Sequence, residues 1–204
     1  QHIHDWSNLH MKMINSLLLV IVALATFQGC APVVVGSAAA GGAALHSRRT
    51  VGTFVDDQGI ELKARMALSD DEELSRQTHI NAISYNGIVL MVGQAPTDEL
   101  RQRAQDRVTG VEKVRHVHNE IVIAAPSSLT ARSNDTLLTG KVKTSLFGIK
   151  GIEGFDATRT KVVTEDGIVY LMGMLYRNEA DAVAERARQV GGVEKVVKLF
   201  EYLD

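Results

Sequence analysis

The chain has 204 residues, with 22 Lys and Arg against 24 Asp and Glu and a formal net charge of −2. This near-neutral balance, without a basic stripe, argues against a dedicated nucleic-acid-binding protein, which must neutralise phosphates. The single cysteine, Cys30, excludes a disulfide within the chain.

Residues 1–29 are predicted to be a leader followed by a secretory signal peptide. The ten residues before Met11 are left out of the fold, and Lys12 supplies a thin positive region before an apolar run over 17–25. As a helix that run reaches about 14 Å, which is too short for the roughly 30 Å core of a bilayer. We therefore expect a signal that is cleaved rather than a membrane span.

The segment Phe27-Gln-Gly-Cys30 resembles the lipobox of bacterial lipoproteins. There the cysteine carries fatty acyl chains such as palmitate and becomes the first residue of the mature protein. The resemblance implies lipid attachment at Cys30, and Ala31 after it, in place of aspartate, points to the outer membrane. The alternative is a plain secretory signal with an incidental cysteine.

Residues 30–50 are predicted to form a lipidated tether. They are mostly Ala, Gly, Val and Ser up to residue 47, so they offer few large side chains to bury. A short helix near the membrane surface is the alternative.

A repeat organises the rest of the chain. Residues 86–93 read Asn-Gly-Ile-Val-Leu-Met-Val-Gly and residues 166–173 read Asp-Gly-Ile-Val-Tyr-Leu-Met-Gly. An identical Gly-Val-Glu-Lys-Val follows at 110–114 and at 192–196. The second copy is two residues longer between these motifs, and we place the insertion in the loop before the helix. The repeat predicts two modules, 51–124 and 133–204, joined by a linker at 125–132.

Each module is predicted to be α-β-β-α-β. In the first, Asp56 and Asp57 are candidate caps of a helix through Leu68, and 70–73 is an acidic solvated turn, with a metal cluster as the alternative. Strands at 79–85 and 88–92 flank an Asn-Gly hairpin turn. The unbroken apolar run of 88–92 predicts a strand covered on both faces. A helix at 97–108 and a strand at 114–124 complete the module.

The second module repeats this order. Its elements are predicted as a helix over 133–147, strands at 161–165 and 168–172, a helix at 177–190 and a strand at 194–203. Asn134-Asp-Thr136 matches a glycosylation sequon but is interpreted as a helix cap. The fold class is α+β, with a small mixed sheet covered by two helices in each module. Because about 70 residues is near the lower limit for independent folding, we expect the modules to pack together.

The sequence offers no catalytic set, metal site or cofactor motif. It has no Gly-x-Ser-x-Gly, no phosphate-binding glycine loop and no second cysteine. His116 and His118 share a face of a probable strand, but no partnering ligand is evident. We therefore predict a protein that is not an enzyme.

The two modules differ in charge and in their first helix. Residues 51–125 carry 12 acidic and 8 basic side chains, a net of −4, whereas residues 126–204 carry 11 of each. On the helix of the second module, Leu138, Val142 and Leu146 recur every four residues and form a core face. A second stripe, about 100° away around the helix, consists of Leu137, Lys141 and Thr144, and Lys143 lies nearby. The resulting candidate phospholipid-binding residues are Leu137, Lys141, Lys143 and Thr144.

An exposed leucine beside lysines at the start of a helix favours contact with an anionic membrane surface. The alternative is that Leu137 packs against the first module and the lysines are solvated.

The α-β-β-α-β unit, with its hairpin glycine and Gly-Val-x-x-Val before the last strand, resembles the BON domain. Two such units behind a lipobox resemble dual-BON outer-membrane lipoproteins. The resemblance implies a periplasm-facing protein that maintains envelope integrity. It also implies binding of anionic phospholipid, such as phosphatidylglycerol, through the first helix of the second domain. The alternative function is a periplasmic adaptor for an outer-membrane assembly factor or an envelope protease.

Overall fold

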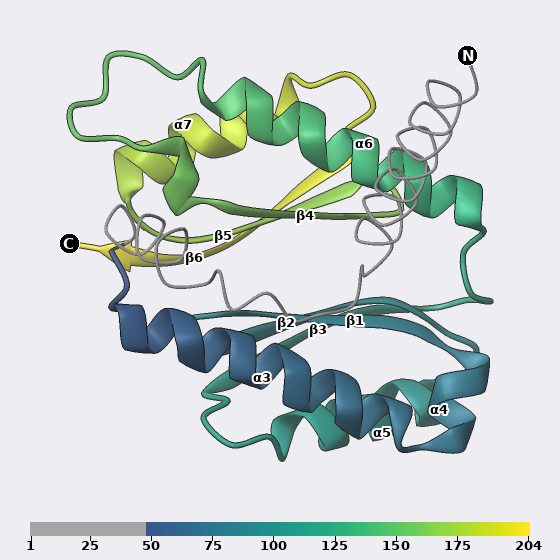
Figure 1. Ribbon diagram of the computed structural model, residues 1–204. Helices are drawn as coiled ribbons and strands as arrows, with labels where there is room; N and C mark the ends of the chain where they lie inside the picture. The colour runs from purple at the N-terminus through teal and green to yellow at the C-terminus, as the bar shows by residue number, and fades with distance from the viewer. Residues whose placement is uncertain (1–47) are drawn as a thin grey trace, which may run out of the picture. The chain divides into compact units, whose positions relative to one another are not determined.

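The computed structural model describes residues 48–204. The predicted signal peptide, lipid attachment at Cys30 and most of the tether lie outside these residues. The described part contains two modules, each with a three-stranded mixed sheet and helices, which confirms the predicted α+β fold (Figure 1).

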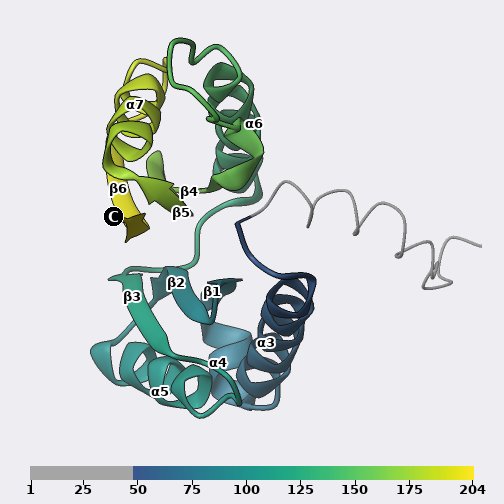
Figure 2. The same ribbon diagram turned by 90° about the vertical axis from the view of Figure 1, so that its left-hand side faces the viewer.

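In the first module, β1 (His79–Tyr85) pairs antiparallel with β2 (Ile88–Ala95), which pairs in parallel with β3 (His116–Ile123). Helices α3 (Val51–Ser69) and α5 (Asp98–Thr109) cover one face of this sheet, and the short α4 (Glu72–Gln77) follows α3 (Figures 1 and 2).

The second module has the same topology. Strand β4 (Lys161–Glu165) pairs antiparallel with β5 (Ile168–Tyr176), which pairs in parallel with β6 (Lys195–Leu203). Helices α6 (Leu129–Leu146) and α7 (Arg177–Arg188) cover one face, and a 3₁₀ turn, η1 (Ala157–Arg159), precedes β4.

The helix starts differ from the predictions because hydroxyl side chains upstream act as caps. Thr50 caps α3, so Asp56 and Asp57 lie inside the helix and the predicted aspartate cap was wrong. Ser128 caps α6, which begins four residues earlier than predicted. Asn134 therefore lies within α6 and is not a cap.

The acidic run at 70–73 was predicted as a turn, but it contains a second helix start. Asp71 accepts a hydrogen bond from the Leu74 amide and caps α4. Its carboxylate also faces the guanidinium groups of Arg103 and Arg107 on α5. The hydrogen bond from the Leu74 amide is the main cause that lowers the pKa of Asp71, and the two arginines add to it. The run thus joins the start of α4 to α5 through ion pairs.

Each central strand is buried on both faces, as predicted for 88–92. On β2, Val89 and Met91 belong to the core beneath the helices of the first module. Leu90 and Val92 face the other way and pack in a separate core with Tyr170 and Met172 of β5. The two sheets therefore contact each other through the faces that the helices leave uncovered. Burial there raises the pKa of Tyr170 to about 12.

In both modules, an aspartate of the first helix supports the hairpin turn. The carboxylate of Asp57, in α3, accepts hydrogen bonds from the amides of Asn86 and Gly87 at 2.8 and 2.9 Å. Asp135, in α6, accepts the equivalent bonds from Asp166 and Gly167 at 2.9 and 3.0 Å. A buried carboxylate on the first helix thus holds the tight turn, where Asn86 and Asp166 both adopt positive φ.

The two Gly-Val-Glu-Lys-Val motifs are not equivalent in the structure. The amide of Arg115 bonds the carbonyl of Gly87, and the amide of Glu194 bonds that of Gly167, so Arg115 corresponds to Glu194. Counting back, Lys113 (φ 70°) corresponds to Gly192 (φ 101°). The motifs are offset by three residues, and the loops between helix and strand, 110–115 and 189–194, have the same length.

The predicted two-residue insertion before the second helix was therefore wrong. The connection before α7 is in fact shorter, because β5 runs directly into the helix whereas Pro96 and Thr97 separate β2 from α5.

Candidate functional site

Helix α6 has one buried and one exposed face, as its spacing predicted. Leu138, Val142 and Leu146 are buried in the core of the second module. Leu137 is 65% exposed, so its side chain does not pack against the first module. Lys141 and Thr144, on the same stripe, are also exposed.

Two further exposed apolar side chains extend this surface, and the sequence reasoning missed both. Leu129, in the first turn of α6, is 79% exposed, and Phe147, directly after its last residue, is 68% exposed. At 1.5 Å per residue they lie about 27 Å apart along the helix direction, with Leu137 between them. Leu129 was missed because the helix was predicted to begin at residue 133.

We call Leu129, Leu137 and Phe147, with the flanking Lys141 and Lys143, the α6 outer face. At 100° per residue, Lys143 projects about 120° around the helix from Leu137. Lys141 lines a hollow of about 340 Å³ together with Leu137 and Gly192. Lys143 and Phe147 instead line a hollow of about 380 Å³ on the other side. The four predicted residues thus do not line one pocket; they spread across an exposed helix surface.

The polar side chains of this surface differ in whether they already have a partner within the protein. None of the ion pairs within residues 48–204 involves Lys141 or Lys143. Thr144, by contrast, donates its hydroxyl to the Gly140 carbonyl within the helix at 2.9 Å. The surface therefore offers two ammonium groups beside three apolar side chains.

Across residues 48–204, no helix is both long and apolar enough to cross a membrane. The same residues contain no group of three or more His, Cys, Asp or Glu placed to hold a metal ion. His116 and His118 do lie side by side on β3, with ring centres 4.6 Å apart. Burial is the main cause that lowers the pKa of His118.

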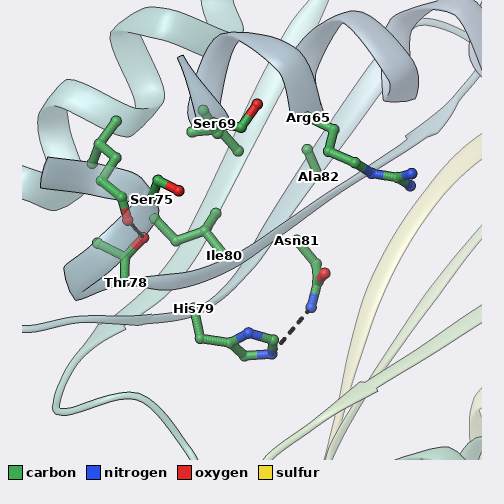
Figure 3. A pocket seen from close by; sticks show the side chains of 10 residues that line it. Arg65, Ser69, Ser75, Thr78, His79, Ile80, Asn81 and Ala82 are labelled. Carbon is green, nitrogen blue, oxygen red and sulfur yellow. Dashed lines mark hydrogen bonds between the residues drawn. The ribbon is translucent and has the colours of Figure 1, made fainter. Parts of the chain in front are cut away.

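A hollow of about 250 Å³ lies between the end of α3, α4 and β1 (Figure 3). Its lining mixes Arg65, Ser69 and Ser75 with His79 and Asn81, whose side chains bond to each other at 3.5 Å. Burial and the nearby Arg132 lower the pKa of His79. This hollow contains none of the candidate residues predicted from the sequence.

Comparison with known proteins gives concordant results. The BON domain model matches residues 56–125 and 134–204. The chain is 35% identical to "Outer membrane lipoprotein DolP" of Haemophilus influenzae, over 95% of this chain and 99% of that protein. It is 39% identical to "21 kDa hemolysin" of Actinobacillus pleuropneumoniae, over 76% of this chain and 78% of that protein. It is 26% identical to "Osmotically-inducible protein Y" of Escherichia coli, over 91% and 94% of the two chains.

The two family matches fall on the two α-β-β-α-β modules, each with its hairpin held by a buried aspartate. Together they cover most of the chain, and the similarity to the Haemophilus protein extends over nearly its whole length. The chain therefore belongs to the BON domain family and carries two copies of the domain.

Proposed function

We propose that this protein is an outer-membrane lipoprotein without catalytic activity that supports envelope integrity and faces the periplasm. The proposal is supported by a relative that is named an outer membrane lipoprotein and is 35% identical to this chain along nearly its whole length. Cys30, behind a lipobox-like segment, is the proposed site of acylation. The acyl chains would anchor the protein while the two modules do the recognition.

We propose further that the α6 outer face binds anionic phospholipid such as phosphatidylglycerol. The observation that carries this proposal is the exposure of Leu129, Leu137 and Phe147 along α6 and at its end, beside two lysines that form no ion pair with any residue of 48–204. Apolar insertion and attraction to head groups then act together. Each lysine contributes about 1 kcal/mol near an anionic surface, so binding by α6 alone is weak and reversible. The anchor holds the protein, and α6 selects the lipid.

Vesicle co-sedimentation tests the proposal with residues 31–204, so that neither the apolar run at 17–25 nor acylation of Cys30 contributes. We expect binding to phosphatidylglycerol vesicles that falls as salt is raised, and weak binding to phosphatidylcholine. Changing Leu137 and Lys141 to Glu should reduce binding about tenfold or more, since it removes the apolar contact and adds like charge. The matched control, Leu62→Glu on α3, should bind as the parent does. Equal binding to both lipids at every salt concentration would contradict the electrostatic part.

A further inference from the structure

Helix α3 has an exposed apolar stripe opposite its core face. Its core face consists of Ile60, Ala64 and Leu68, with the buried Asp57 beside them. Four large apolar side chains on the other side are each between 54 and 60% exposed. We call this set the α3 stripe: Val51, Val55, Leu62 and Met66. At 100° per residue these positions fall within about 60° of one another.

The α3 stripe lies on the first helix of the first module, whereas the α6 outer face lies on the first helix of the second. Helix α3 covers one sheet and α6 covers the other, and the two sheets pack against each other through their remaining faces. The two helices approach each other where Phe54 and Gln58 of α3 line one hollow together with Lys143 of α6 and Phe147 directly after it.

The spacing of the α3 stripe reads the same in both directions. Successive positions are separated by four, seven and four residues. A twofold axis between Gln58 and Gly59 would place Val51 beside Met66 of a second copy, and Val55 beside Leu62 of a second copy. This self-complementarity is what an isologous contact between identical chains requires.

The side chains around the axis suit such a contact. A Cβ added at Gly59 would meet nothing within 4 Å, so the helix surface is open at the point where the two helices would cross. On one flank, Asp56 and Lys63 lie seven residues apart, and their present partners are the exposed Lys113 and Glu112. In the antiparallel pair, Asp56 of one copy and Lys63 of the other would be offset by only about 3 Å along the helix direction.

We propose that two copies of this chain associate through an antiparallel α3–α3 contact centred between Gln58 and Gly59. Four apolar side chains are few beside the roughly 800 Å² that each partner buries in a stable interface, so association in free solution is weak. Anchoring on one membrane surface raises the effective concentration and favours the pair.

Cysteine crosslinking in cells that produce the full chain tests this contact. Two differently tagged copies are co-produced, one with Val55→Cys and the other with Leu62→Cys, and are oxidised. We expect a 55–62 crosslink between the tags. Copies that both carry Val55→Cys should crosslink poorly, because the two positions are offset by about 10 Å along the helices, whereas a disulfide needs Cα atoms within about 7 Å.

The control variant is Gly59→Arg, which places charge and bulk at the axis. It improves helix propensity at an open position, so the fold should be unaffected. We expect it to reduce the 55–62 crosslink about tenfold. The chain with Cys30 as its only cysteine reports crosslinking through the native thiol. No preference for 55–62 over 55–55, or a 55–62 crosslink unchanged by Gly59→Arg, would overturn the proposal, whatever the vesicle experiment shows for α6.

Discussion

Two buried aspartates show how one residue fixes the hairpin of each module. Asp57 and Asp135 occupy equivalent places, but their surroundings differ. Asp57 is 1% exposed and also accepts bonds from the Ser84 hydroxyl and the Arg49 guanidinium, both at 2.6 Å. Asp135 is 9% exposed, and within residues 48–204 it accepts hydrogen bonds from the two turn amides. The first module therefore depends more on its aspartate than the second.

The matched substitutions Asp57→Ala and Asp135→Ala test this difference. Removing Asp57 breaks its ion pair with the half-buried Arg49 and takes the acceptor from two turn amides and the Ser84 hydroxyl, so we expect a loss of about 3–5 kcal/mol of unfolding free energy. Removing Asp135 leaves the two amides and should cost about 1–3 kcal/mol. Urea unfolding measures both. Equal losses would mean that the Arg49 and Ser84 contacts contribute nothing.

These roles could not be assigned from the sequence. An aspartate near a helix start is most simply a cap, and Asp57 was interpreted so. Its function became visible only when tertiary structure placed a hairpin 29 residues later against it. The Asn-Gly and Asp-Gly turns, by contrast, were predicted correctly because positive φ at both positions is a local demand.

At the scale of elements, the strands were predicted best and the helix ends worst. The alternation of 79–85 and the apolar run after each turn determine which strand is central. Helix starts depend on caps such as Thr50 and Ser128, which resemble ordinary loop residues in a single sequence. This error hid Leu129, so part of the α6 outer face was not predicted. Phe147 was missed because nothing local distinguishes an exposed phenylalanine at a helix end from a core one.

The three-residue offset of the repeated motif leads to a test within one loop. Gly192 has φ 101°, whereas the adjacent Gly191 does not have positive φ, and a Cβ there would meet nothing within 4 Å. We expect Gly192→Ala to cost about 1–3 kcal/mol and Gly191→Ala to change stability by less than about 0.5 kcal/mol. Thermal unfolding compares the two. If the sequence motifs were equivalent in structure, Gly192 would correspond to Gly110 (φ −73°) and alanine would be harmless there.

At the scale of the whole molecule, polar contacts join the modules around the sheet-to-sheet core. Arg48, just before α3, pairs with the buried Glu179 of the second module, with the closest hydrogen bond at 2.5 Å and a second at 2.8 Å. Gln94 of β2 donates to Glu165 of β4 at 2.7 Å and accepts from the Ser127 amide. Packing of the modules was expected from their small size, but these pairs involve separations of 71 and 131 residues that no local pattern reveals.

Glu165 makes this contact dependent on pH. Burial raises its pKa, an effect that the hydrogen bond from Gln94 only partly offsets. A raised pKa in the folded state means that the carboxyl favours folding when protonated. Its stabilising contribution is therefore present below the ordinary value of 4.5 and is lost as pH rises through the folded-state pKa.

Glu165→Gln is the corresponding test. Because the amide keeps an acceptor for Gln94 and carries no charge to bury, the variant should unfold at higher temperature than the parent at pH 8. The difference should disappear near pH 4, where Glu165 is protonated. Melting curves across this range give the comparison, and a constant difference at all pH values would show that ionisation of Glu165 is irrelevant.

The central claim is that the α6 outer face meets anionic lipid, and a tryptophan reporter tests it most directly. The only native tryptophan is Trp6, so a chain of residues 31–204 lacks both tryptophan and the apolar run at 17–25 and gives a silent background. In that background, Leu137→Trp should show a blue-shifted emission with phosphatidylglycerol vesicles and little shift with phosphatidylcholine, since its ring enters the interface. Gln102→Trp, at an exposed position of α5 outside both the α6 outer face and the α3 stripe, should not respond. An unshifted Leu137→Trp, or an equal shift at both positions, would contradict the account.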